Sequence, residues 1–187
     1  MNQKNRCRWC NLKNPIYVAY HDEEWCRPDF DDHHLYEMLI LESFQAGLSW
    51  ECVLNKRESF REAYDNFDLE KVCAYGQQKV TELQNNLAII RNKLKIQASI
   101  QNSIIFRGIA EEYGSFYSYL KSFAGESILY ETDKTANFLS DAISKDLQKR
   151  GMKFVGSTII YSYLQAVGFI YSHDRECYLH KEPAPSE

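Results

Sequence analysis

Two thiols and two imidazoles lie at opposite ends of the chain, in a pattern that can bind a metal ion. Cys7 and His21 are near the start, and His173 and Cys177 are near the end. Together they supply the ligands of a tetrahedral zinc site. On a helical turn, His173 and Cys177 would face the same side, because residues four apart do so. A zinc ion bound by both pairs would join the two ends of the chain and stabilise the fold.

A second ligand set fits the spacing equally well. Residues 7–10 form a CxxC motif, and Cys177 and His180 form a CxxH motif. Cys7, Cys10, Cys177 and His180 therefore make an alternative zinc site. A thioredoxin-like redox function is not favoured, because no βαβ pattern surrounds the CxxC motif. The simplest alternative is that the cysteines are unrelated thiols of a reduced protein.

The segment from Trp9 to Trp50 is rich in aromatic side chains and contains one acid in apolar surroundings, Glu42. The Glu42 carboxylate either faces solvent or lies in a pocket against a partner, because burying an unpaired charge is costly. Aromatic faces beside a buried acid suit a flat, cationic ring with donors on its edge, such as an alkylated purine. The alternative is that the aromatic residues belong to the core and Glu42 is on the surface.

Length and composition restrict the fold and the partners. With 187 residues, of which 44% are hydrophobic, the chain forms one domain or two packed lobes. It has no membrane-spanning run and a polar start without a signal peptide, so we expect a cytoplasmic protein with reduced thiols. The formal charge of −4 disfavours a general polyanion binder. Two basic clusters, at 149–153 and 91–95, could still form a local basic face or simply solvated helix ends.

The hydrophobic pattern predicts an all-α fold without convincing strands. We expect one domain over 1–180 and a disordered tail over 181–187. The predicted helices are 31–46, 50–63, 68–76, 77–84, 89–112, 115–123, 136–150 and 157–168. Asp31 or Asp32, Ser49 and Asp68 are the expected N-caps.

Two segments, 83–91 and 150–158, are typical of a helix, a tight turn and a second helix. In the second segment, the helix that follows Gly156 presents free backbone N–H groups at its N-terminus. Such an end attracts a phosphate, and Ser157 and Thr158 can add hydroxyl donors. Turns of this kind occur in any helical bundle, so the pattern alone is weak support for DNA binding.

Four strings resemble the 3-methyladenine DNA glycosylase I family, which belongs to the helix-hairpin-helix DNA glycosylases. They are YVAYHDEEW (17–25), LESFQAGLSW (41–50), AIIRNKLKI (88–96) and KRGMKFVGSTIIYSYLQAVG (149–168). The resemblance covers roughly residues 6 to 178 and is weakest between 97 and 137. It implies a compact helical glycosylase domain whose termini are joined by a structural zinc ion.

The resemblance also assigns roles to residues. It implies that Cys7, His21, His173 and Cys177 bind zinc, which disfavours Cys10 and His180. It implies that Glu42 is the acid that recognises the base and the catalytic residue, that Tyr20 and Trp50 stack on the base, and that Trp9 and Tyr17 complete the pocket wall. The wedge that enters the DNA stack corresponds to Gly47 and Leu48. The turn that holds the DNA backbone corresponds to Lys153, Gly156, Ser157 and Thr158.

The implied activity is excision of N3-methyladenine from alkylated double-stranded DNA. The nucleotide is flipped out, with Leu48 in part of the gap and the base between Trp50 and Tyr20, and the N-glycosidic bond is hydrolysed. Free 3-methyladenine is the product. No lysine is prominent as a Schiff-base nucleophile, so we expect no strand cleavage, and we expect a monomer.

The chain departs from the family pattern at two positions. Cys26 and Ala88 stand where the family usually has glycine, and Ala88 would strain its turn if a positive φ were needed there.

Two other functions compete with the implied one. One competing function is a zinc-stapled module that binds damaged DNA or a protein without catalysis. The other is a zinc hydrolase, which needs an open coordination position that four protein ligands would close.

Overall fold

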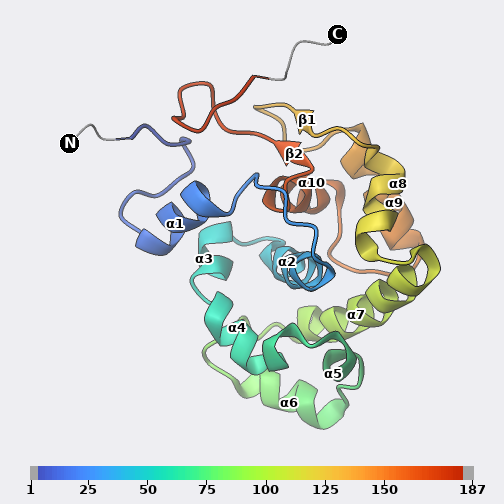
Figure 1. The fold of residues 1–187 in the computed structure, drawn as a ribbon. Coiled ribbons are helices and arrows are strands. Elements are labelled where there is room, and N and C mark those ends of the chain that lie inside the picture. The colour runs from blue at the N-terminus through green and yellow to red at the C-terminus, as the bar shows by residue number, and fades with distance from the viewer. Residues whose placement is uncertain (1–3, 183–187) are drawn as a thin grey trace.

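The computed structural model describes residues 4–182, and this part of the chain is mostly helical (Figure 1). Its helices are α1 (Pro15–Glu23), α2 (Asp32–Gln45), α3 (Trp50–Leu54), α4 (Arg57–Ala63), the short 3₁₀ helix η1 (Asp65–Phe67), α5 (Leu69–Cys73), α6 (Gln77–Asn85), α7 (Lys93–Tyr113), α8 (Phe116–Ala124), α9 (Phe138–Lys149) and α10 (Ser157–Ala166). Two strands, β1 (Leu129–Tyr130) and β2 (Ile170–Tyr171), form a parallel pair. The sequence did not reveal this pair, because two-residue strands show no alternation.

The predicted caps begin their helices. The Asp31 side chain accepts hydrogen bonds from the backbone of His33 and His34 at the start of α2. Ser49 and Asp68 cap α3 and α5 in the same way. These side chains satisfy backbone N–H groups that have no partner within the first helical turn.

Several predicted boundaries were wrong. The helix predicted over 50–63 is interrupted at Asn55 and Lys56, which separate α3 from α4. The helix predicted from residue 89 begins at Lys93 instead, because the Asn92 side chain caps it by accepting from the Lys95 N–H. Helix α1 was missed, although Asn14 as N-cap followed by a proline is a recognised helix start. The segment from 173 to 177 is an irregular turn, not a helical one.

Helix α2 lies at the centre of the fold, with α10 and α7 packed against it (Figure 1). Every residue of α2 from Leu35 to Phe44 is buried. A helix that is buried all round belongs to the core of the molecule. An acid on this helix, such as Glu42, is therefore held away from bulk water. Within residues 4–182, no helix combines the length and the apolar character that crossing a membrane requires.

The two ends of the described chain lie side by side, as the blue and red segments of Figure 1 show. The backbone N–H of Tyr178 donates to the Asn5 carbonyl over 2.8 Å. The Asn5 side chain donates in turn to the Glu176 carbonyl over 2.6 Å. These contacts bring the first and last metal-ligand candidates into the same region. The end of the predicted tail, 183–187, lies outside the described residues.

The two departures from the family pattern have different consequences. Ala88 is absent from the residues with positive φ, so its turn is not strained. Cys26 has φ 61° and is buried. Its backbone N–H donates to the Gln165 carbonyl at 3.0 Å, and its Sγ accepts from the Ser172 N–H at 3.3 Å. Surrounding contacts thus hold a conformation that glycine adopts more easily.

Gly168 is the glycine that the packing of α10 requires. It has φ +84°, and an added Cβ would overlap the backbone of Arg27 and Pro28. We expect Gly168→Ala to lower the free energy of unfolding by about 3 kcal/mol, measured by urea denaturation. Gly108→Ala is the matched control, because Gly108 lies within α7 at ordinary φ with open space around its Cα. The control should be neutral or stabilising by about 0.5–1 kcal/mol. Equal effects of the two substitutions would contradict the packing argument.

Candidate active site and metal centre

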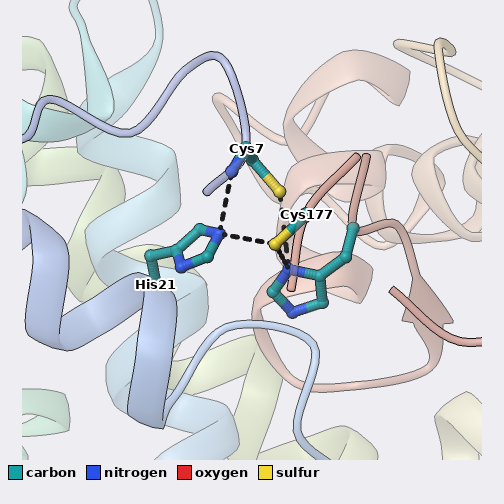
Figure 2. Close-up of side chains that lie close together, drawn as sticks. Cys7, His21 and Cys177 are labelled. Atoms are coloured by element: carbon teal, nitrogen blue, oxygen red, sulfur yellow. Dashed lines mark hydrogen bonds between the residues drawn. The ribbon is translucent and has the colours of Figure 1, made fainter. Parts of the chain in front are cut away.

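The four residues implied as zinc ligands come together at the joined ends of the chain. One ligand atom from each of Cys7, His21, His173 and Cys177 lies within 4.8 Å of the others, and all four residues are buried. Figure 2 shows the sulfur atoms of Cys7 and Cys177 turned toward one another, with the His21 ring directed at them. A compact, buried group of two thiols and two imidazoles has the composition of a closed structural metal site.

The distances within this cluster fit a tetrahedral ion. His21 Nε2 lies 3.5 Å from Cys177 Sγ, and His173 Nδ1 lies 3.4 Å from Cys7 Sγ. Bond lengths of zinc to sulfur and nitrogen place such ligand atoms about 3.5 Å apart on a tetrahedron. The Asp22 carboxylate lies 2.8 Å from His21 Nδ1 and so directs Nε2 toward the sulfurs. Burial lowers the pKa of His173 to about 4, which keeps its ring in the neutral form that binds metal.

The alternative ligand set does not form. Cys10 Sγ lies 3.9 Å from the Tyr17 carbonyl and does not belong to the cluster. His180 Nδ1 lies 2.9 Å from the His173 carbonyl, and its Nε2 lies 3.2 Å from a Glu182 carboxylate oxygen. Both ring nitrogens of His180 are therefore engaged elsewhere. The two sets that spacing left open are separated by the fold, which carries Cys10 and His180 away from the four clustered ligands.

A cavity of about 280 Å³ opens next to this cluster. Helices α1, α2, α3 and α10 contribute to its wall, together with the N-terminal segment, the α1–α2 and β1–α9 loops and the segment after β2. It is lined by Trp9, Tyr17, Tyr20, Trp25, Glu42, Gln45, Trp50, Asp133, Lys134, Ser162, Gln165, Ser172 and Asp174. Its size is near the lower end of small-molecule pockets, about 300 Å³, which suits a single planar base.

Glu42 reaches this cavity from the central helix. Its residue is 2% exposed, and its Oε2 atom is buried without a hydrogen-bond partner among the described residues. Burial raises the pKa of Glu42 well above its ordinary value. The alternative of a surface acid is therefore wrong. A buried carboxyl oxygen without a partner is a site at which a donor or a cation is stabilised.

The aromatic side chains form the walls of the cavity. The ring centroids of Tyr20 and Trp50 are 5.5 Å apart, with their planes at 52°. Trp9 packs on Tyr17 at 5.1 Å. The Tyr20 and Trp50 rings touch at an angle and leave no parallel slot between them, so in this arrangement a flat ligand stacks on one face of the pair. Trp50 Nε1 is buried without a partner in the described structure, as is Gln45 Oε1, and each offers a further polar contact.

The two segments implied in DNA binding lie on turns that are at least partly exposed. Gly47 and Leu48 form the turn after α2, where Gly47 has φ 78° and Leu48 is 42% exposed. In the other segment, Gly156 begins α10 without a side-chain cap, and Thr158 and Lys153 are exposed. The Ser157 hydroxyl, however, donates to the Asp141 carboxylate. Ser157 is therefore engaged within the protein, whereas Thr158 is exposed and no side chain caps the backbone N–H groups at the start of α10.

Comparison with known proteins identifies the family. The family model described as methyladenine glycosylase matches residues 9–180. The chain belongs to this family. DNA-3-methyladenine glycosylase 1 of Escherichia coli (strain K12) is 40% identical over 178 residues, which cover 92% of this chain and 95% of the relative.

Two solved structures support the same relationship. A crystal structure of 3-methyladenine DNA glycosylase I matches with a TM-score of 0.90 and 39% identity, over 95% of this chain and all of the other. A variant of such an enzyme in complex with 3-methyladenine matches with a TM-score of 0.88 and 31% identity, over 93% and 96% of the two chains. The fold of this chain is thus that of the methyladenine glycosylase family.

Part of this glycosylase's cavity wall was missed at the level of sequence. Ser162 and Gln165 line it from α10, and they are polar positions about one turn apart in the largely apolar part of the helix after Thr158. That spacing was a usable signal. Asp133 and Lys134 come from the loop between β1 and α9, in the region where the family resemblance is weakest, and no motif marks them. Their approach depends on the parallel pairing of β1 and β2.

The raised pKa of Glu42 predicts a pH-dependent stability for this family member. An acid whose pKa is higher in the folded state than in the unfolded chain stabilises the fold at low pH. That stability is lost as pH rises from the ordinary value, about 4.3, toward the raised one. We expect the stability of Glu42→Gln relative to wild type to increase as the pH rises above the ordinary glutamate pKa of about 4.3, measured by urea unfolding across this range.

Glu62→Gln is the matched control for the chemical change, because Glu62 is exposed on α4. A Glu42→Gln difference that stays constant across this pH range would contradict the burial of an unpaired carboxyl group.

Proposed function

We propose that this protein flips N3-methyladenine out of alkylated double-stranded DNA and hydrolyses its N-glycosidic bond. The observation that carries the proposal is the buried Glu42 carboxyl with an unpartnered oxygen in an aromatic cavity. The ligand named for the solved relative, 3-methyladenine, supports it. We further propose that residues 1–180 act as one monomeric glycosylase domain, since its core includes residues from Cys7 to Cys177.

The charge of the substrate accounts for the use of a buried acid. N3-methylated adenine in DNA is positively charged, so it is already a good leaving group. On binding, its edge donors and its charge meet the Glu42 carboxyl group, whose ionisation is opposed by burial in the empty cavity and favoured by a nearby cation. The flat base stacks on the Trp50 and Tyr20 pair, with Trp9 and Tyr17 behind it, and gains cation–π attraction of about 0.5–2 kcal/mol. Neutral adenine gains neither term.

The chemistry requires water at C1′ and no covalent intermediate with the protein. Glu42 is the residue placed to orient that water, in addition to recognising the base. Lys134 lines the cavity, but its Nζ lies 2.6 Å from a Glu131 carboxylate oxygen. A paired ammonium is a poor nucleophile. The proposed reaction therefore ends with a free base and an abasic site, without strand cleavage.

DNA binding is proposed for two segments, the turn that follows the central helix and the turn between α9 and α10. Leu48 is exposed on a tight turn and enters the gap left by the flipped nucleotide. The turn between α9 and α10 is proposed as the helix-hairpin-helix element, in which the N-terminus of α10, Thr158 and Lys153 contact phosphate oxygens. The backbone N–H groups after Gly156 support this assignment, since no side chain caps them.

Glu42→Gln tests the proposed role of the acid. The substitution keeps the size of the side chain but removes the negative charge that meets the cationic base. We expect the rate of 3-methyladenine release from methylated duplex DNA to fall by about 100-fold. The rate is measured by chromatography of the released base. Glu62→Gln should release the base at the wild-type rate. If Glu42→Gln matched wild type, the acid would have no part in the reaction. Absence of base release by wild type would favour the non-catalytic binding module.

The Cys7, His21, His173 and Cys177 cluster is proposed to bind a structural zinc ion. Zinc would cross-link the ends of the chain and take no part in the reaction, because four protein ligands leave no position for water. We expect Cys177→Ala to lose stoichiometric metal and to be less stable by several kcal/mol, on the order expected for a structural zinc ligand. Metal content is measured by atomic emission, and stability by thermal unfolding.

The excision rate of Cys177→Ala, measured well below its melting temperature, should stay close to wild type. Cys52→Ala is the control, because Cys52 is a half-buried thiol outside the cluster. Loss of turnover in a folded, metal-free protein would instead support the zinc hydrolase.

A further inference from the structure

Lys95 is a buried lysine at the start of α7. Its residue is only 7% exposed, whereas Arg91 and Lys93 in the same basic cluster are exposed. Lysine is almost never buried without partners. The Lys95 ammonium donates to the Phe44 carbonyl over 2.8 Å and to the Ala46 carbonyl over 2.5 Å. Lys95 therefore binds the protein interior, and this member of the cluster does not belong to a basic surface.

The two carbonyls that Lys95 holds are at the C-terminal end of α2. The last carbonyls of a helix have no partner within it, and a cation there also complements the helix dipole. The turn that follows contains Gly47 and Leu48, and the Leu48 N–H donates to the Gln45 carbonyl over 2.6 Å. The ammonium thus fixes the point at which the chain leaves the helix of Glu42 and enters the turn of Leu48.

Helix α7, which carries Lys95, also holds the turn between α9 and α10. The Lys95 ammonium lies 5.8 Å from the centre of the Phe154 ring. About two turns further along α7, the Asn102 side chain donates to the Lys153 carbonyl and accepts from the Lys153 N–H, each over 2.9 Å. Phe154 itself has φ 57°, a conformation that its surroundings must hold. Helix α7 therefore contacts both segments assigned to DNA binding.

We propose that Lys95 is a positioning residue for base excision: it holds the Leu48 turn at a fixed place relative to the α9–α10 turn. Insertion of Leu48 then coincides with anchoring of the DNA backbone, and the flipped base is delivered to Glu42. This inference rests on the proposed glycosylase function. A phosphate contact by Lys95 is a poorer explanation, because its ammonium is directed inward at two carbonyls.

The test compares Lys95→Met with Lys93→Met in three measurements. Lys95→Met keeps the length of the side chain but removes the donors, whereas Lys93→Met removes a neighbouring exposed charge. The first measurement is single-turnover release of 3-methyladenine from methylated duplex DNA at low and moderate salt. The second is the affinity for free 3-methyladenine, measured by tryptophan fluorescence. The third is thermal unfolding.

We expect Lys95→Met to excise the base about tenfold or more slowly at both salt concentrations, while it binds the free base as wild type does. For Lys93→Met we expect only the smaller, salt-dependent loss of a surface charge. In a Leu48→Ala background, Lys95→Met should cost little more, because both changes act on the same turn.

Three results would overturn the inference: wild-type excision by Lys95→Met, an equal loss of free-base binding and excision, or full additivity with Leu48→Ala. If Lys95→Met does not fold, Lys95→Gln takes its place, since a shorter neutral amide cannot hold both carbonyls. Full excision by a folded Lys95→Gln would also overturn the inference. Wild-type protein that releases no 3-methyladenine would reject the proposed function itself, which is a different outcome from any of these.

Discussion

The site depends on a carboxyl group that the fold removes from water and leaves without a partner. Glu42 lies on a helix that is buried on every side, so neither solvent nor a protein cation stabilises its charge. Such a group costs stability in the empty protein, since burial opposes its ionisation. The rest of the architecture has to support that cost. Helices α7 and α10 bury α2, and aromatic rings line one part of the cavity at its end.

The Cys/His cluster and the cavity share a helix, which connects the two ends of the chain to the cavity wall. Tyr20 and His21 are consecutive on α1, and Tyr20 lines the cavity while His21 joins the cluster. The Trp9 and His21 rings lie 5.3 Å apart, so the segment that carries Cys7 also delivers a wall of the cavity. An ion bound by the cluster would thus stabilise the segment that carries part of the cavity wall, without taking part in a chemical step.

The outcome for individual residues shows what sequence contained and what it did not. Caps such as Asp31 and Ser49 could be predicted, because they are local and depend on one side chain. The family strings pointed to Glu42, which lies in the cavity wall, and favoured Cys7, His21, His173 and Cys177 over Cys10 and His180; the first four lie together. The features that could not be predicted depend on contacts between distant parts of the chain. They are the two-residue strand pair, the turn at 173–177 and the cavity residues Asp133 and Lys134. The inward direction of Lys95 is of the same kind, since an isolated basic cluster does not reveal which side chain meets a helix end.

Selection between a damaged and a normal base follows from the energetics of the empty cavity. A neutral purine that enters it meets an acid whose ionisation is opposed by burial, so little Coulomb attraction is available. A cationic purine lowers the cost of ionising Glu42, and the attraction between the two charges is stronger than in water because the carboxyl group is buried. The same burial that destabilises the empty site therefore increases the difference between the two bases. A solvated acid on the surface would bind both weakly and distinguish them poorly, which is a physical reason for placing Glu42 on the central helix.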